Sequence, residues 1–194
     1  MIHNGEYYPL IKAFGGQALN ISTNTDTHIN PFDSSLQYAK NDKEAIKEKS
    51  EFILAFIESI VNGLSGEQKT LTDRCTNNIY EDYKLHKEYE PDFKKFYNEL
   101  LRQPESEAKN LALIIERYVK GNMDIFAKKT NIEIKNRFIT FDISELPPSI
   151  QTTGYLVVLD HIINRLHRNK TLGKHTWIFI DEFHILLANK FSSE

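Results

Sequence analysis

The sequence predicts an α/β fold in which an all-helical insert interrupts a parallel sheet. Residues 177–180 are four large apolar residues in a row, and a run that is apolar on both faces suits a strand buried in a parallel sheet. Residues 43–121, by contrast, keep apolar residues at helical spacing throughout. We therefore divide the chain into a first part of the α/β core at 1–42, the insert at 43–121, and a second part of the core at 122–194.

The first part of the core is expected to hold a short helix and a strand. Gly15 and Gly16 end the helix, because glycine favours the backbone conformation that commonly follows a helix C-terminus. Residues 18–22 then read as extended, and the Asn-Pro pair in the polar loop at 23–33 is a turn signal. The apolar face of the helix comprises Tyr8, Leu10, Ile11 and Phe14.

The insert is expected to contain four helices. Residues 65–68 (Ser-Gly-Glu-Gln) have the form of a capping box at the start of the second helix. Pro91 and Pro104 punctuate the third and fourth helices, and Gly121 ends the fourth. The apolar positions at helical spacing are Ile46, Ile53, Ile57, Ile60, Val61 and Leu64 in the first helix, Leu71, Cys75, Ile79 and Tyr83 in the second, and Leu111, Ala112, Ile115, Tyr118 and Val119 in the fourth.

The second part of the core reads as strand, helix, strand. Residues 137–142 are the first strand, and Pro147 and Pro148 break the chain after it. A long helix follows and stops near Asn169, and the second strand ends at Asp181. This order predicts a βαβ unit with a right-handed crossover. One side of the long helix carries Leu156, Leu159, Ile163 and Leu166.

Two adjacent carboxylates, Asp181 and Glu182, follow the apolar run at 177–180. Ligands of open α/β sheets bind at the carboxyl ends of the strands, so these acids are candidates to hold a metal and to activate water. The pattern is typical of a Walker B strand in a partial RecA-like P-loop NTPase core. An alternative explanation is a buried strand that leads into a helix, with Asp181 as N-cap and Glu182 in the first turn.

A phosphate-binding loop of the form G-x-x-x-x-G-K-[ST] is absent from the 194 residues. Residues 173–176 (Gly-Lys-His-Thr) do not qualify, because Arg168 stands where the first glycine belongs and His175 separates the lysine from the threonine. We therefore expect that the chain either is not an NTPase or is a piece of one that begins downstream of this loop.

Several segments in order resemble a known family. They are residues 5–16 (Gly-Glu-Tyr through Gly-Gly), 27–33 (Thr-His-Ile-Asn-Pro-Phe-Asp), 71–80, 122–132 and 177–187. Together they resemble the C-terminal motor domain of the TraC/TraE-type ATPases of conjugation and type IV secretion, the VirB-four class of the FtsK/HerA superfamily. The resemblance covers nearly the whole chain. The chain departs from the family at its start, where Met1 to Asn4 replace an Asp-Pro-Glu-like strand end.

This resemblance implies roles for three residues: Asp181 in the magnesium shell, Glu182 as catalytic base, and Glu6 near the nucleotide. It implies ATP and Mg²⁺ as ligands of an intact protein, and none bound by this chain. It further implies a fragment that is inactive alone, since the Walker A loop would lie upstream of Met1. Intact relatives are expected to form a ring oligomer at the cytoplasmic inner face of the membrane, to dock on type IV secretion channel proteins, and to have an indirect link to transferred DNA.

Two other functional classes stay open. Asp181, Glu182 and His184 match the Asp-Glu-x-His tetrad of DExH-type helicases, although residues 186–190 show no sign of the further helicase segments. The chain could instead be a non-catalytic interaction module. Basic residues and histidines also gather around the end of the long helix, where they suit either a solvated helix terminus or a subunit or substrate contact, including an arginine finger. They are His161, Arg165, His167, Arg168, Lys170, Lys174 and His175.

The composition is that of an ordinary globular protein. Hydrophobic residues make up 40% and aromatic residues 11%, and the formal net charge is -3, so bulk charge requires neither a nucleic acid nor a membrane partner. Cys75 is the only cysteine, which excludes disulfides within the chain and favours a reducing compartment. We expect no signal peptide and no transmembrane segment. The incomplete sheet should leave strand edges open, which predicts self-association or poor solubility.

Overall fold

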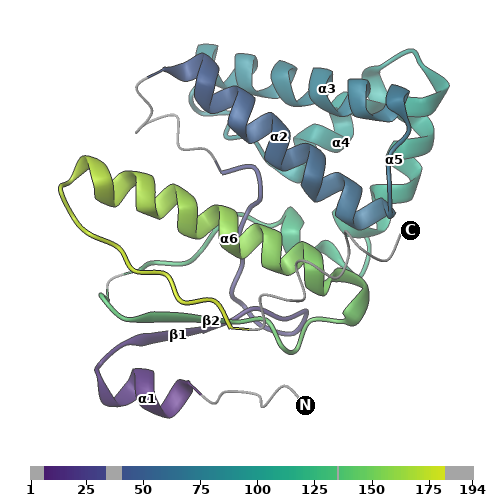
Figure 1. Cartoon of the computed structure of the whole chain (residues 1–194). Helices are drawn as coiled ribbons and strands as arrows, with labels where there is room; N and C mark the ends of the chain where they lie inside the picture. Colours follow the sequence, from purple (N-terminus) through teal and green to yellow (C-terminus); the bar gives the residue numbers. More distant parts are fainter. Residues whose placement is uncertain (1–6, 34–40, 135, 182–194) are drawn as a thin grey trace.

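The computed structural model describes residues 7–33, 41–134 and 136–181, and Figure 1 shows their arrangement. In chain order the elements are α1 (Tyr8–Ala13), β1 (Gln17–Asn20), α2 (Asp42–Val61), α3 (Gly66–Leu85), α4 (Phe93–Arg102), α5 (Ser106–Val119), the 3-10 helix η2 (Asp124–Ala127), β2 (Ile139–Asp142) and α6 (Pro148–Thr171).

The described sheet consists of β1 and β2, which pair in parallel with Gln17 opposite Ile139 and Asn20 opposite Asp142. In Figure 1 the sheet lies between α6 on one side and α1 on the other, and the helices α2 to α5 form a further layer beyond α6. The parallel pairing of strands that flank a helical block confirms the α/β class that the sequence predicts. The division into a two-part core and an insert stays a prediction.

All four helices expected in the middle of the chain are present, and their ends follow the local sequence. Ser65 and Gln68 form the expected capping box, in which each side chain accepts a hydrogen bond from the backbone N–H of the other residue. The side chains of Asn41 and Asp92 likewise accept a hydrogen bond from a backbone N–H in the first turn of α2 and α4 respectively. At the end of α2, Asn62 takes the left-handed conformation that often terminates a helix.

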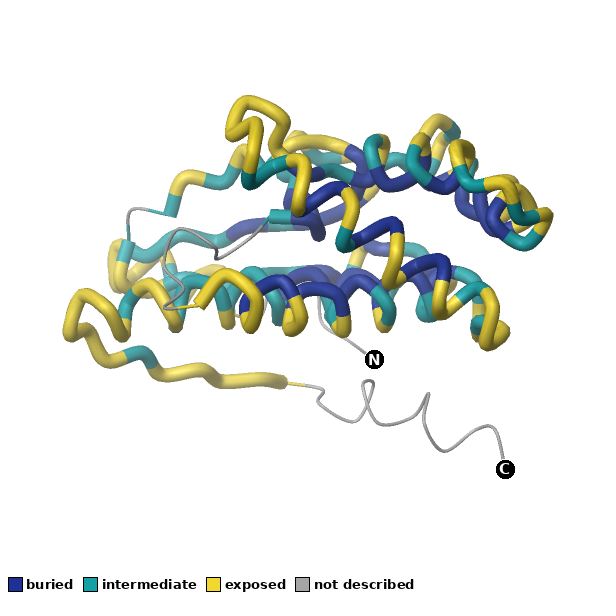
Figure 2. Tube along the Cα trace, turned by 90° about the horizontal axis from the view of Figure 1, so that it is seen from above, coloured by how far each residue is buried: buried dark blue, intermediate teal, exposed yellow. Residues whose placement is uncertain are grey.

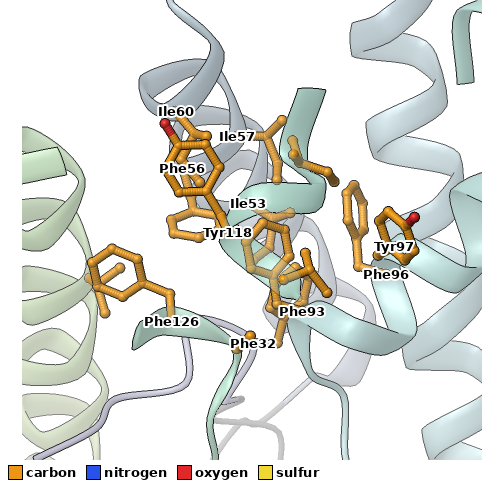
Figure 3. Close-up of a cluster of buried hydrophobic side chains, with 14 of the residues drawn as sticks. Phe32, Ile53, Phe56, Ile57, Ile60, Phe93, Phe96, Tyr97, Tyr118 and Phe126 are labelled. Atoms are coloured by element: carbon orange, nitrogen blue, oxygen red, sulfur yellow. The ribbon is translucent and has the colours of Figure 1, made fainter. Parts of the chain in front are cut away.

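An aromatic cluster forms the centre of the core (Figure 3). Phe32, from the loop before α2, is fully buried, and its ring lies 5.8 Å from that of Phe93 and 5.5 Å from that of Phe96. Phe56 of α2 makes edge contacts with Phe93 and with Phe126 of η2. Apolar packing therefore attaches both the loop that contains Phe32 and the 3-10 helix η2 to the helical block.

The predicted apolar positions of the helical block are confirmed. Nearly all are buried, and Val61, Leu64 and Tyr83 are half-buried against the same core. The long helix differs from its prediction, because its buried positions are Ile150, Thr153, Gly154, Val157 and Val158. The apolar stripe that begins at Leu156 is only partly covered.

Residues 177–180 differ most from the prediction. They do not belong to the described sheet, and Trp177 and Phe179 are 85% and 91% exposed. Figure 2 shows this stretch along the outside of the molecule. A strand that is apolar on both faces is stable only with a neighbouring strand and with a packed layer on each face, and the exposure of residues 177–180 shows that the described residues do not surround them in this way. The expected buried strand and βαβ unit are therefore not formed within the described residues.

Candidate functional site: Asp181 beside the first helix

Asp181, the first carboxylate after the apolar run, lies next to the start of α1. The hydroxyl of Tyr7 donates a hydrogen bond to Oδ2 of Asp181 at 3.0 Å, and both side chains are exposed. Tyr7 is the N-cap residue of α1, and a proline in the first turn fixes the backbone there. The contact joins two segments that are far apart in the sequence.

A local turn after α6 leads the chain toward this contact. After α6, Gly173 adopts a positive φ of 67°, and the backbone N–H of Lys174 donates to the carbonyl of Asn169 at 2.8 Å. The side-chain amide of Asn169 donates to Thr176 at 2.9 Å. These bonds fold the chain back after the helix and start it toward Asp181.

The structure describes one of the three site residues that the sequence predicts. Asp181 is described and exposed, as a carboxylate that meets a solvated ligand must be. Glu6 and Glu182 lie outside the described residues, and so does His184. Within the described part of the chain, no group of three or more His, Cys, Asp or Glu side chains could hold a metal ion. What the structure shows at Asp181 is an exposed carboxylate that accepts a hydrogen bond from a phenol.

The basic cluster at the end of α6 separates into two parts. The ring of His161 packs edge-on against Phe141 of β2 at 6.0 Å. Burial, together with Arg165 and Lys49, lowers the pKa of His161 to about 4, so this side chain is neutral at pH 7. Burial and the neighbouring Arg168 also lower the pKa of Arg165. His167 and the residues after it in the cluster are exposed.

A second polar site was not predicted from the sequence. Lys49 of α2 is only 6% exposed, and its ammonium lies 2.7 Å from Oδ2 of Asp160 on α6. The sequence does contain a sign of a buried charge here, because Lys49 lies on the apolar stripe of α2 between Ile46 and Ile53. A charged residue at such a position is buried only when it has a partner. The partner itself could not be identified from the local pattern.

Comparisons with known proteins identify the architecture. No protein-family model and no curated protein matches this chain. Among solved structures, VirB4 of Thermoanaerobacter pseudethanolicus superposes with a TM-score of 0.72 over 84% of this chain and 67% of that chain, at 18% sequence identity. The fold is VirB4-like. The sequence segments resemble the same class of protein, and the two results agree in the fold that they indicate.

The VirB4-like fold of the described residues contains no helix that combines the length and the apolar composition needed to span a bilayer.

Proposed function

We propose that this chain is part of an ATP-hydrolysing motor of the VirB4 class, of the TraC/TraE type, that acts in type IV secretion and conjugative transfer. The observation that carries the proposal is the hydrogen bond between Tyr7 and Asp181 in a VirB4-like fold. The bond joins Asp181, at the end of the Walker B-like run, to Tyr7 at the start of α1. Both segments belong to those that resemble the family.

The proposed roles follow from the chemistry of the side chains. Asp181 is exposed and would hold the magnesium shell through its carboxylate, as the Walker B aspartate does in P-loop enzymes. Glu182 would accept a proton from the attacking water, because it directly follows Asp181 in the chain. Glu6 would approach the nucleotide. Mg²⁺, when bound, would neutralise charge on the phosphates.

The 194 residues contain no phosphate-binding loop, so we expect this chain alone neither to bind Mg-ATP tightly nor to hydrolyse it. Isothermal titration calorimetry of the chain with Mg-ATP should give no measurable heat of binding. Micromolar affinity would overturn this part of the proposal, because it would require phosphate contacts other than those of such a loop.

Glu182→Gln tests the catalytic role in a longer chain that supplies the phosphate-binding loop. This variant should retain nucleotide binding and lose ATP turnover, because the amide cannot accept the proton. Glu88→Gln, in the exposed turn after α3, is the matched control and should leave both unchanged. Unchanged turnover in Glu182→Gln would exclude Glu182 as the base. Absence of turnover in the longer chain without any substitution would contradict the motor function itself.

The proposed setting is a ring oligomer at the cytoplasmic inner face of the membrane, in contact with type IV secretion channel proteins and indirectly with transferred DNA. The exposed apolar run at 177–180 supports association of the chain with itself or with further strands. Sedimentation velocity should show concentration-dependent oligomers of the chain. A monodisperse and very stable monomer would count against association through this run.

A further inference from the structure

Two polar contacts of different length tie α2 to α6. The hydroxyls of Ser59 and Thr153, near the C-terminus of α2, lie 2.9 Å apart. Nearer the N-terminus of α2, the ammonium of Lys49 lies 2.7 Å from Oδ2 of Asp160. The first contact joins two short side chains, whereas a lysine carries its ammonium on a long four-carbon stem. The helices therefore lie closer together at Ser59 than at Lys49, and Figure 1 shows these antiparallel helices moving apart toward the N-terminus of α2.

The space between the diverging helices is a cleft of about 360 Å³. Its walls are largely apolar and come from both helices. Apolar side chains at helical spacing normally face a core. Those on α6 face this cleft, and Ile163 among them is 39% exposed. Closer packing of α2 on α6 would remove this apolar surface from water. The apolar lining residues are Ala45, Phe52, Leu156, Leu159 and Ile163.

The pair of Lys49 and Asp160 lies at the base of the cleft. Both side chains are largely buried, and each has a further neighbour. The amide of Asn164 donates to Asp160 at 3.0 Å, and the ammonium of Lys49 lies 4.5 Å from the centre of the Phe52 ring. A buried ion pair seldom stabilises a fold more than apolar residues of the same volume would. Its effect here is geometric, because the two charged groups keep their volume and their hydrogen bond between the helices.

The angle between α2 and α6 sets the position of the helical block relative to the sheet. In Figure 1, α6 lies next to the sheet and α2 faces it from the helical block. Phe56 of α2 packs against both Phe32 and Phe126, so the loop before α2 and the 3-10 helix η2 are fixed to the block. A change in the angle would therefore move these elements together as one body.

We propose that the Lys49–Asp160 pair is a spacer that holds the helical block in an open position, and that loss of the pair lets the block turn about the Ser59–Thr153 contact and close the cleft. Burial of the apolar walls favours the closed position. The pair opposes it, because closure leaves no room for both charged groups with their hydrogen bonds. Any event that separates Asp160 from Lys49 shifts the chain toward the closed position. This device does not depend on the proposed ATPase function.

Distances between spin labels, measured by double electron-electron resonance, test this hinge. One pair of labels, on Glu44→Cys and Lys170→Cys, spans the open end between α2 and α6. A second pair, on Ala55→Cys and Ser149→Cys, lies toward the other end of the same helices. All four positions are exposed, and Cys75→Ala removes the native thiol.

Lys49→Met combined with Asp160→Leu removes the spacer. The distance across the open end should shorten by roughly 3 Å or more, as α2 and α6 approach the spacing of helices in apolar contact. The second distance should stay the same. Lys49→Arg keeps the charge and the length of the side chain and should keep both distances. Lys69→Met combined with Glu58→Leu, which removes an exposed pair between α3 and α2, is the matched control and should also keep both.

An unchanged distance across the open end in the doubly substituted chain would overturn the proposal. Equal shortening of the two distances would also contradict it, because the helices would then approach without a hinge. Ile163→Trp, added to the two substitutions, refills the cleft with a large ring and should restore the parent distance; a distance that stays short would mean that closure does not occur at this cleft. If circular dichroism shows that the doubly substituted chain is unfolded, Lys49→Met with Asp160→Asn, which is closer in shape, replaces it under the same expectation.

Discussion

The ammonium of Lys49 lies 2.7 Å from a carboxylate oxygen of Asp160, a residue 111 positions later in the chain. The pair joins α2 of the helical block to α6, the helix that leads toward Asp181. Both side chains are largely buried, at 6% and 17% exposure. A buried ion pair adds little net stability compared with apolar residues, but removal of one partner leaves an uncompensated charge.

Lys49→Met should therefore destabilise the fold by about 3 kcal/mol, because Asp160 loses its partner inside the protein. Urea unfolding followed by circular dichroism measures this change as a lower midpoint. Lys49→Met combined with Asp160→Leu should recover most of the lost stability, since the uncompensated carboxylate of Asp160 is then removed. Lys69→Met, which breaks the exposed pair of Lys69 with Glu58, should cost less than about 1 kcal/mol. Similar losses for the two single variants would contradict the buried pairing.

The lowered pKa of His161 predicts how the stability of the fold changes with pH. Its pKa is lowered from 6.5 to about 4 in the folded chain, so the unfolded chain binds more protons between these values. Stability should therefore decrease as pH falls from about 6.5 to about 4, by on the order of 3 kcal/mol for this group.

Urea midpoints measured between pH 7 and pH 4.5 test this slope, with His161→Phe as the variant. The substitution keeps an aromatic ring against Phe141 and removes the titrating group, so the pH dependence should become shallower. His175→Phe, at an exposed position, is the control and should keep the slope of the parent chain. If the urea midpoint of His161→Phe changes with pH as steeply as that of the unsubstituted chain, other groups cause the pH dependence.

Cys75 offers a direct probe of opening of the helical block. Its thiol is fully buried on α3, and burial, with a smaller contribution from Glu99, raises its pKa to about 12. Only the thiolate reacts readily, so the folded chain should react with Ellman's reagent on the order of a thousandfold or more slowly than the chain in urea. Rapid reaction of the folded chain at pH 8 would mean that α3 is not packed as described.

Gly16 tests the packing between α1 and the sheet. A Cβ atom on Gly16 would lie 2.8 Å from the carbonyl oxygen of Phe138 and 2.7 Å from Cγ2 of Ile11. Gly16→Ala should therefore destabilise the fold by about 1 to 3 kcal/mol, because the backbone of the neighbouring strand must move. Gly66→Ala is the control, since a Cβ atom there meets nothing within 4 Å. Thermal unfolding that gives equal midpoints for the two variants would contradict this close approach.

The helices were predictable because their signals are local. The capping box at Ser65 and the four-residue spacing of Leu71, Cys75 and Ile79 depend only on neighbouring positions, and the structure confirms them. The apolar content of residues 137–142 predicts a strand, and the structure forms β2 over Ile139–Asp142. Each of these patterns is complete within one element, so no knowledge of the rest of the chain was needed.

The remaining features depend on partners that are distant in the sequence. The apolar run at 177–180 has the composition of a strand, but whether it pairs depends on the rest of the sheet, and in the described sheet it pairs with neither β1 nor β2. Similarly, nothing near Lys49 reveals Asp160, and nothing near Tyr7 reveals Asp181. The roles of Glu6 and Glu182 remain proposals, since both residues lie outside the described part of the chain.

The pairing of β1 with β2 also bears on the order of folding. The entire helical block separates the two strands in the chain, so their ladder can close only after a long segment has been brought back on itself. Contacts among α2 to α5 are closer in sequence and should form earlier. We therefore expect the helical block to collapse first and to bring Gln17 close to Ile139, so that the pairing of β1 with β2 is the last and slowest step of assembly.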